Sequence, residues 1–109
     1  MTRRLRLTTY ARTDLDEIFA FLAARNPTAA RRYVTELREQ CDTYLANPFM
    51  GHQEPEVAER LGETPEHVRS FLYRNHRCYY IVTDEEMRVL GFIHTSRDRD
   101  TVLEERFPG

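Results

Sequence analysis

Residues 11–48, ARTDLDEIFAFLAARNPTAARRYVTELREQCDTYLANP, have the pattern of two amphipathic helices joined by a short turn. Pro27 separates them, because a residue before proline is disfavoured in the helical region while proline itself suits a first helical position. Apolar residues recur at helical spacing on both sides: Leu15, Ile18, Phe19 and Leu22, then Ala30, Tyr33, Val34, Leu37, Cys41, Tyr44 and Leu45. The spacing predicts a helical hairpin that ends at Asn47-Pro48 and needs a sheet to cover its apolar stripes.

Strand patterns flank this hairpin. Residues 5–8 alternate apolar and polar, as a short half-buried strand does. After the hairpin, residues 49–66 predict a long surface connection with one short helical turn at 55–61. Three runs rich in Val, Ile, Phe and Tyr follow, at residues 67–73, 77–83 and 87–95. Their short connections favour antiparallel neighbours.

The predicted fold class is therefore α+β, in a two-layer β-α-α-β-β-β order with the N-terminal strand and helical hairpin packed on one face of a mainly antiparallel sheet. The last two strands are apolar at both odd and even positions, so both faces of the sheet should be covered. The hairpin can cover only one face. The other is expected to be a seat for a partner chain.

Length and composition fit one globular domain over residues 1–109. The chain is 40% apolar, with six tyrosines and six phenylalanines, and has a formal net charge of −2. All 16 cationic side chains are arginines. Residues 67–83 hold Arg69, Arg74 and Arg77 without an acid. A local basic patch of this kind makes direct nucleic-acid binding the less favoured interpretation, since the rest of the chain is not basic.

The remaining sequence signals point to a cytoplasmic protein without a metal or cofactor. Cys41 and Cys78 lie far apart and belong to no ligand-spacing motif, so they are interpreted as reduced thiols. No segment approaches the ~20 consecutive apolar residues that a membrane span requires. The basic N-terminus is followed by no apolar run of the kind that a secretory signal contains.

The order and spacing of several motifs resemble the RelE/ParE superfamily of type II toxin-antitoxin toxins, and the ParE-type members in particular. The resemblance spans nearly the whole chain. It rests on Asp14-Leu15-Asp16-Glu17-Ile18-x-x-Phe21-Leu22-Ala23-x-x-Asn26-Pro27-x-Ala29-Ala30, Leu45-Ala46-x-Pro48-x-x-Gly51, Arg69 with Phe71, Tyr79-Tyr80-Ile81-Val82, and His94-x-x-Arg97-Asp98.

This resemblance implies a compact toxin that forms a hetero-oligomer with a cognate antitoxin, whose C-terminal segment folds against it. In ParE-type members the target is DNA gyrase, and in RelE-type members it is mRNA in the ribosomal A site. The favoured hypothesis is a non-enzymatic gyrase inhibitor. A third hypothesis is a degenerate member of the superfamily that only binds its antitoxin.

The alternative is a ribosome-dependent endoribonuclease. RNA cleavage needs a proton acceptor, a proton donor and cations around the phosphate. The best-known RelE pattern supplies several of these groups as lysines, which this chain lacks. A second superfamily pattern uses Glu, Arg and His. The residues that could correspond to this second pattern are Glu66, Arg69, His94 and Arg97. Their spacing in the sequence does not show whether they meet in one site.

Partner contact is the favoured role for a wider set of residues: Phe21, Arg69, Tyr73, Arg77, His94, Arg97 and Asp98. Phe21 lies off the apolar stripe of its helix, and guanidinium groups bind carboxylates bidentately. Acidic residues of the antitoxin are expected to meet Arg69, Arg77 and Arg97 on the second face. Each assignment has a structural alternative: Tyr73 in the core, His94 half-buried, and Arg97-Asp98 as a local ion pair.

Overall fold

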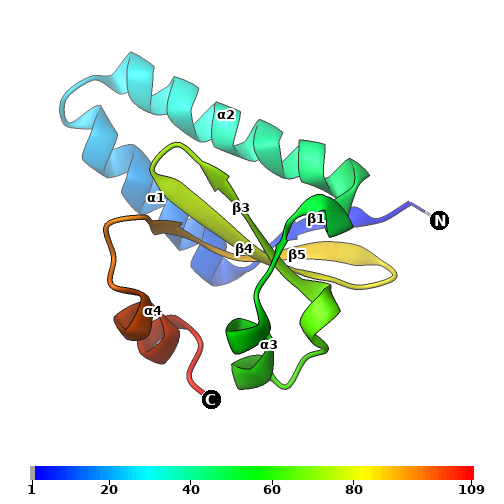
Figure 1. The fold of residues 1–109 in the computed structure, drawn as a ribbon. Coiled ribbons are helices and arrows are strands. Elements are labelled where there is room, and N and C mark those ends of the chain that lie inside the picture. Colours follow the sequence, from blue (N-terminus) through cyan, green and yellow to red (C-terminus); the bar gives the residue numbers. More distant parts are fainter. Residues whose placement is uncertain (1) are drawn as a thin grey trace.

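The computed structural model describes residues 2–109, and its α+β architecture confirms the predicted fold class. Figure 1 shows the elements in chain order. They are β1 (Arg4–Leu7), α1 (Thr9–Ala23), α2 (Pro27–Ala46), β2 (His52–Gln53), α3 (Pro55–Leu61), β3 (Val68–Tyr73), β4 (His76–Val82), β5 (Glu86–His94) and α4 (Arg99–Arg106), with 3₁₀ turns at Pro48–Met50 and Pro65–His67. None of the helices in the described part is long and apolar enough to cross a membrane.

The sheet has the order β1-β5-β4-β3-β2, and every neighbouring pair is antiparallel except β1 with β5. This parallel pair arises because the hairpin of α1 and α2 lies between β1 and the rest of the sheet in sequence. The register places Tyr73 opposite His76, and His76 opposite His94. These three residues therefore share one end of the sheet.

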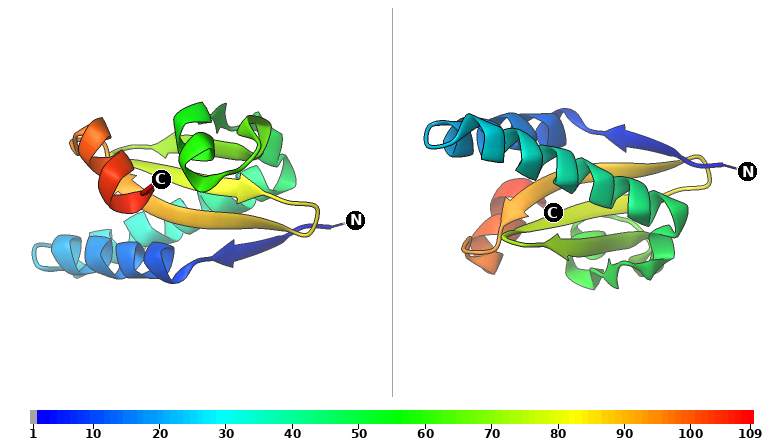
Figure 2. Two further views of the ribbon diagram at one scale, coloured as in Figure 1. Left: turned by 90° about the horizontal axis from the view of Figure 1, so that it is seen from below. Right: turned by 90° about the horizontal axis from the view of Figure 1, so that it is seen from above.

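The helical hairpin covers one face of the sheet, as Figure 2 shows from above and below. The Thr8 side chain caps α1 by accepting from Ala11 N, and Asn26 caps α2 by accepting from Ala29 N. The core under the hairpin consists of Ala11, Leu15, Leu37, Cys41, Phe71, Cys78, Tyr80, Val82, Met87, Val89 and Phe92. Cys41 and Cys78 are buried free thiols.

The second face of the sheet was expected to be open to a partner chain, but the chain's own helices cover much of it. Helices α3 and α4 pack on it and form a second core with Val57, Ala58, Val68, Tyr79, Ile81, Ile93, Val102, Leu103 and Phe107. Helix α3 matches the predicted helical turn, whereas α4 was not predicted. Its eight residues are too few for a strong periodic signal, and the Asp98 side chain that caps it was interpreted as a partner contact. The chain thus covers much of this face itself.

Candidate functional site

A pocket of about 560 Å³ opens at the end of the sheet where β4 begins and β5 ends. We call it the hairpin pocket, because α1 and the start of α2 form one of its walls. Its apolar lining includes Ile18, Phe21, Leu22 and Phe92, and its polar lining includes Asp14, Glu17, Tyr33, His76, His94, Arg97 and Arg106. Both charge signs and an apolar surface are therefore present in one concave site, as protein-recognition sites commonly have.

Phe21 is the most exposed apolar residue of this site. Its side chain is 74% exposed near the C-terminal end of α1, whereas Ile18 and Leu22 on the same helix are half-buried. Burial of a phenylalanine against a partner is worth about 2 kcal/mol. Phe21 therefore has the chemistry of an anchor residue for another protein.

Two histidines stack edge to face inside the pocket. The ring centroids of His76 and His94 are 5.1 Å apart, and His76 Nδ1 lies 2.7 Å from the hydroxyl of Tyr33. Burial lowers the pKa of His76 from its ordinary 6.5 to about 4, helped by the nearby His94 and opposed by Asp14. His76 is therefore uncharged at neutral pH. His94 Nδ1 accepts from Ser96 N at 3.0 Å, which puts the ring proton of neutral His94 on Nε2.

An ion pair forms the wall of the pocket beside α4. Arg106 donates to both carboxylate oxygens of Asp14, at 3.0 and 2.7 Å, and Phe92 N donates to Asp14 Oδ2 at 2.9 Å. The Arg106 and Asp14 side chains are only 17% and 12% exposed. A Cβ on Gly91 would lie 2.4 Å from Arg106 Nη2, so the absence of a side chain there makes room for this pair. Sequence analysis missed it, because 92 residues separate the partners.

Three of the sequence-predicted residues, Phe21, His94 and Arg97, line this one pocket. Arg97 forms its ion pair with Glu105 at 2.8 Å, and the expected pair with Asp98 is replaced by this contact. Asp98 instead accepts from the backbone N and the hydroxyl of Thr101, at 3.1 and 3.0 Å. Its carboxylate thus serves as the N-cap of α4.

Glu66 and Arg69 lie elsewhere. Arg69 donates to the carbonyl oxygens of Glu66, Phe49 and Gly51 at 2.8, 3.1 and 3.0 Å. It is paired with Tyr80 on β4, four residues from His76, and a strand rises ~3.3 Å per residue, so Arg69 is about 13 Å along the sheet from the histidine pair. The structure does not bring Glu66 and Arg69 together with His94 and Arg97.

Tyr73 and Arg77 occupy opposite faces of the sheet. The Tyr73 hydroxyl donates to Glu36 on α2, and the Tyr73 ring packs 5.8 Å from that of Tyr33. Arg77 donates to Ser70 Oγ at 2.9 Å on the second face, and Ser70 in turn donates to Glu54 at 2.6 Å. Both side chains therefore have partners within the chain. Among residues 2–109, no group of three or more His, Cys, Asp or Glu residues could hold a metal ion.

Comparison with known proteins gives the family. Residues 5–99 match the family described as the ParE toxin of the type II toxin-antitoxin system, parDE. Among solved structures, a chain of the chromosomal ParDE TA system from P. aeruginosa is similar, with a TM-score of 0.67 and 24% sequence identity over 85% of this chain and 96% of that chain. No curated protein gives a significant match.

The structural likeness supports the fold, and the family match extends from the second residue of β1 to the first residue of α4. It therefore includes the hairpin, strands β2 to β5, all but the first residue of β1, and every lining residue of the hairpin pocket except Arg106. This chain belongs to the ParE toxin family of type II toxin-antitoxin systems.

Proposed function

We propose that this toxin inhibits growth by binding DNA gyrase through the hairpin pocket, and that a cognate antitoxin neutralises it in the cytoplasm. The observation that carries the proposal is the exposed Phe21 at a concave apolar site that also contains His94 and Arg97. An aromatic anchor beside an arginine is the composition that dominates binding energy at protein interfaces. The family gives the toxin role, and gyrase is the target that the ParE-type resemblance implies.

The polar groups of the pocket favour binding over chemistry. An RNA-cleaving site needs several cations and an acid-base pair around one phosphate. Here Arg69 lies about 13 Å along the sheet from the paired residues His76 and His94, and Glu66 lies in the turn before β3, beyond Arg69. His76 is uncharged at neutral pH and so adds no cation beside His94. These contacts support a surface that recognises a protein.

The two functions can be compared in one experiment. Toxin refolded away from its antitoxin is titrated into a gyrase supercoiling assay and, in parallel, into a ribosomal mRNA cleavage assay. The proposal predicts inhibition of supercoiling without mRNA cleavage. Cleavage that is lost in His94→Ala, with supercoiling unaffected, would support the endoribonuclease instead. Addition of the antitoxin before the gyrase should restore supercoiling.

A further inference from the structure

Tyr10 and Phe21 are the two most exposed large apolar side chains in the part of the chain that the structure describes, at 72% and 74%. Both belong to α1, and the 11 residues from one to the other make three turns of the helix. They therefore lie on the same face of α1, about 16 Å apart along its axis. Asp14 and Glu17 lie between them on this face. We call these four residues the α1 stripe.

The α1 stripe is continuous with the hairpin pocket. Asp14, Glu17 and Phe21 line this pocket, and Tyr10 lies one turn before Asp14. Single exposed apolar side chains are common on protein surfaces and imply no function by themselves. Here two of them lie at the ends of one helical face and are joined by residues of a concave site. The stripe therefore extends the surface proposed for gyrase towards the start of α1.

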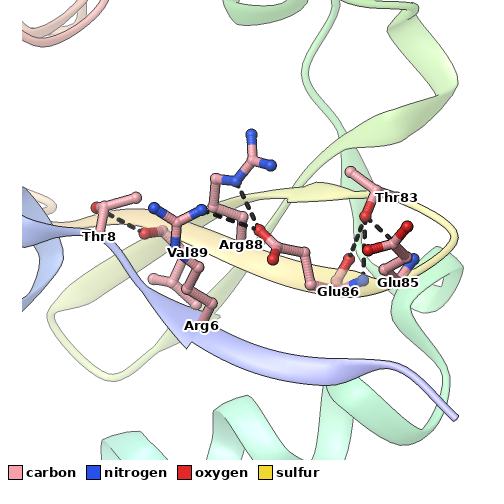
Figure 3. A network of polar contacts seen from close by, with 7 residues as sticks. All are labelled: Arg6, Thr8, Thr83, Glu85, Glu86, Arg88 and Val89. Atoms are coloured by element: carbon pink, nitrogen blue, oxygen red, sulfur yellow. Dashed lines mark hydrogen bonds and ion pairs between the residues drawn. The ribbon is translucent and has the colours of Figure 1, made fainter.

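Tyr10 is held in place although it is exposed. The Arg106 guanidinium lies 5.5 Å from the centroid of the Tyr10 ring, in cation–π geometry. The same guanidinium donates to both carboxylate oxygens of Asp14 and is itself mostly buried. The start of α1 is fixed as well, because the Thr8 side chain caps the helix and its hydroxyl donates to Val89 O at 2.8 Å (Figure 3). An aromatic side chain that is already ordered loses less conformational entropy on binding than a mobile one.

The uncompensated charge of the stripe belongs to Glu17. The carboxylate of Asp14 is paired with Arg106 in the wall of the hairpin pocket. Glu17 is exposed in the middle of the stripe and lines the pocket. A complementary partner therefore offers a cationic side chain opposite Glu17, between two apolar depressions about 16 Å apart.

We propose that Tyr10 is a second anchor residue for gyrase, so that the toxin binds the enzyme along the whole α1 stripe and not through the hairpin pocket alone. The Tyr10 ring fills one apolar depression of gyrase, the Phe21 ring fills the other, and a gyrase lysine or arginine lies against Glu17. This inference rests on the proposed binding of gyrase. It adds a residue outside the hairpin pocket and sets the distance between the two anchors.

The role of the ring is tested with Tyr10→Ala, Tyr10→Phe and Met50→Ala. Met50 is 52% exposed and lies outside the stripe and the hairpin pocket, so it controls for the loss of an exposed apolar side chain. Affinity for purified gyrase is measured by calorimetry, after thermal melts have shown that each variant folds. We expect Tyr10→Ala to weaken binding by about 10-fold, and Tyr10→Phe and Met50→Ala to stay within about 2-fold of wild type.

The outcomes separate the second anchor from the proposed function. Wild-type affinity for Tyr10→Ala, or an equal loss for Met50→Ala, would overturn the second anchor and leave the hairpin pocket as the binding surface. A loss for Tyr10→Phe as large as that for Tyr10→Ala would overturn the role of the ring. Failure of wild-type toxin to bind gyrase would instead contradict the proposed function itself.

The charge is tested by comparing Glu17→Arg with Asp16→Arg. Both variants make the same charge change at exposed neighbouring positions of α1, but Asp16 lies outside the stripe and the hairpin pocket. We expect Glu17→Arg to weaken gyrase binding by about 10-fold at low salt and by less at high salt, whereas Asp16→Arg should stay within about 3-fold of wild type. Equal losses would overturn the placement of a gyrase cation against Glu17. A dimer of the toxin alone in analytical ultracentrifugation, dissociated by Tyr10→Ala, would assign the stripe to a second copy of the chain and overturn the proposal.

Discussion

Arginine and aromatic side chains lie near both ends of strand β4, but their surroundings differ. Near its C-terminal end, Arg69 on the neighbouring strand binds the carbonyls of Phe49 and Gly51, and the Tyr80 hydroxyl donates to Pro48 O at 2.6 Å, so that these side chains fix the 48–51 loop. At its N-terminal end, His76 and His94 lie in the hairpin pocket with Arg97 and the exposed Phe21. An arginine or aromatic residue is available to a partner only where the chain leaves its surface uncovered.

The largest expected effect concerns the wall of the hairpin pocket. Asp14→Ala removes the carboxylate that binds Arg106 and Phe92 N, which leaves a mostly buried guanidinium and an amide without this partner. We expect a loss of about 3 kcal/mol in the free energy of unfolding, measured by urea denaturation. Asp16→Ala, an exposed aspartate on the same helix, is the control and should change stability by less than ~0.5 kcal/mol. A similar result for both variants would contradict a structural role for the pair.

The next prediction compares the arginines at the two ends. Arg69→Ala removes two hydrogen bonds to the 48–51 loop, a third to Glu66 O, and the contact of the guanidinium with the Phe49 ring, 5.4 Å away. It should cost about 2 kcal/mol of stability. Arg97→Ala breaks only an exposed ion pair with Glu105 and should cost less than ~1 kcal/mol. If thermal melts showed Arg97→Ala to be the more destabilised variant, the contrast between the two ends would be wrong.

A smaller effect should appear in the pH dependence of stability. The folded-state pKa of His76 is depressed to about 4, so between about pH 4 and 6.5 the unfolded chain binds more protons than the folded chain. His76 therefore stabilises the fold fully above pH 6.5, and this contribution declines as the pH falls towards 4. His76→Phe should flatten the change in urea midpoint across this interval. An equally steep decline in the variant would assign the effect to other groups.

Sequence patterns predicted the elements with long or regular signals. The hairpin followed from two apolar stripes around Pro27, and β3, β4 and β5 followed from their Val, Ile, Phe and Tyr content. Helix α4 and the two-residue strand β2 were too short to give a periodic pattern.

The site could be predicted only in part, for physical reasons. Phe21 was predicted as a candidate partner-contact residue because it lies off the apolar stripe, and the structure shows that it is exposed. The pairing of Asp14 with Arg106 depends on how α1, β5 and α4 meet, and no local pattern records that. Likewise, Arg69 has the same type of side chain as Arg97. Only the path of the 48–51 loop in the structure shows that the Arg69 guanidinium binds backbone carbonyls.

The comparison of surfaces is tested most directly by the affinity of the toxin for purified gyrase. Phe21→Ala and Leu72→Ala each remove one exposed apolar side chain, 74% and 52% exposed, and only Phe21 lines the hairpin pocket. We predict that Phe21→Ala weakens gyrase binding by about 10-fold or more without loss of stability, whereas Leu72→Ala binds within about 2-fold of wild type. Wild-type affinity for Phe21→Ala, or equal losses for both variants, would contradict the hairpin pocket as the gyrase-binding surface.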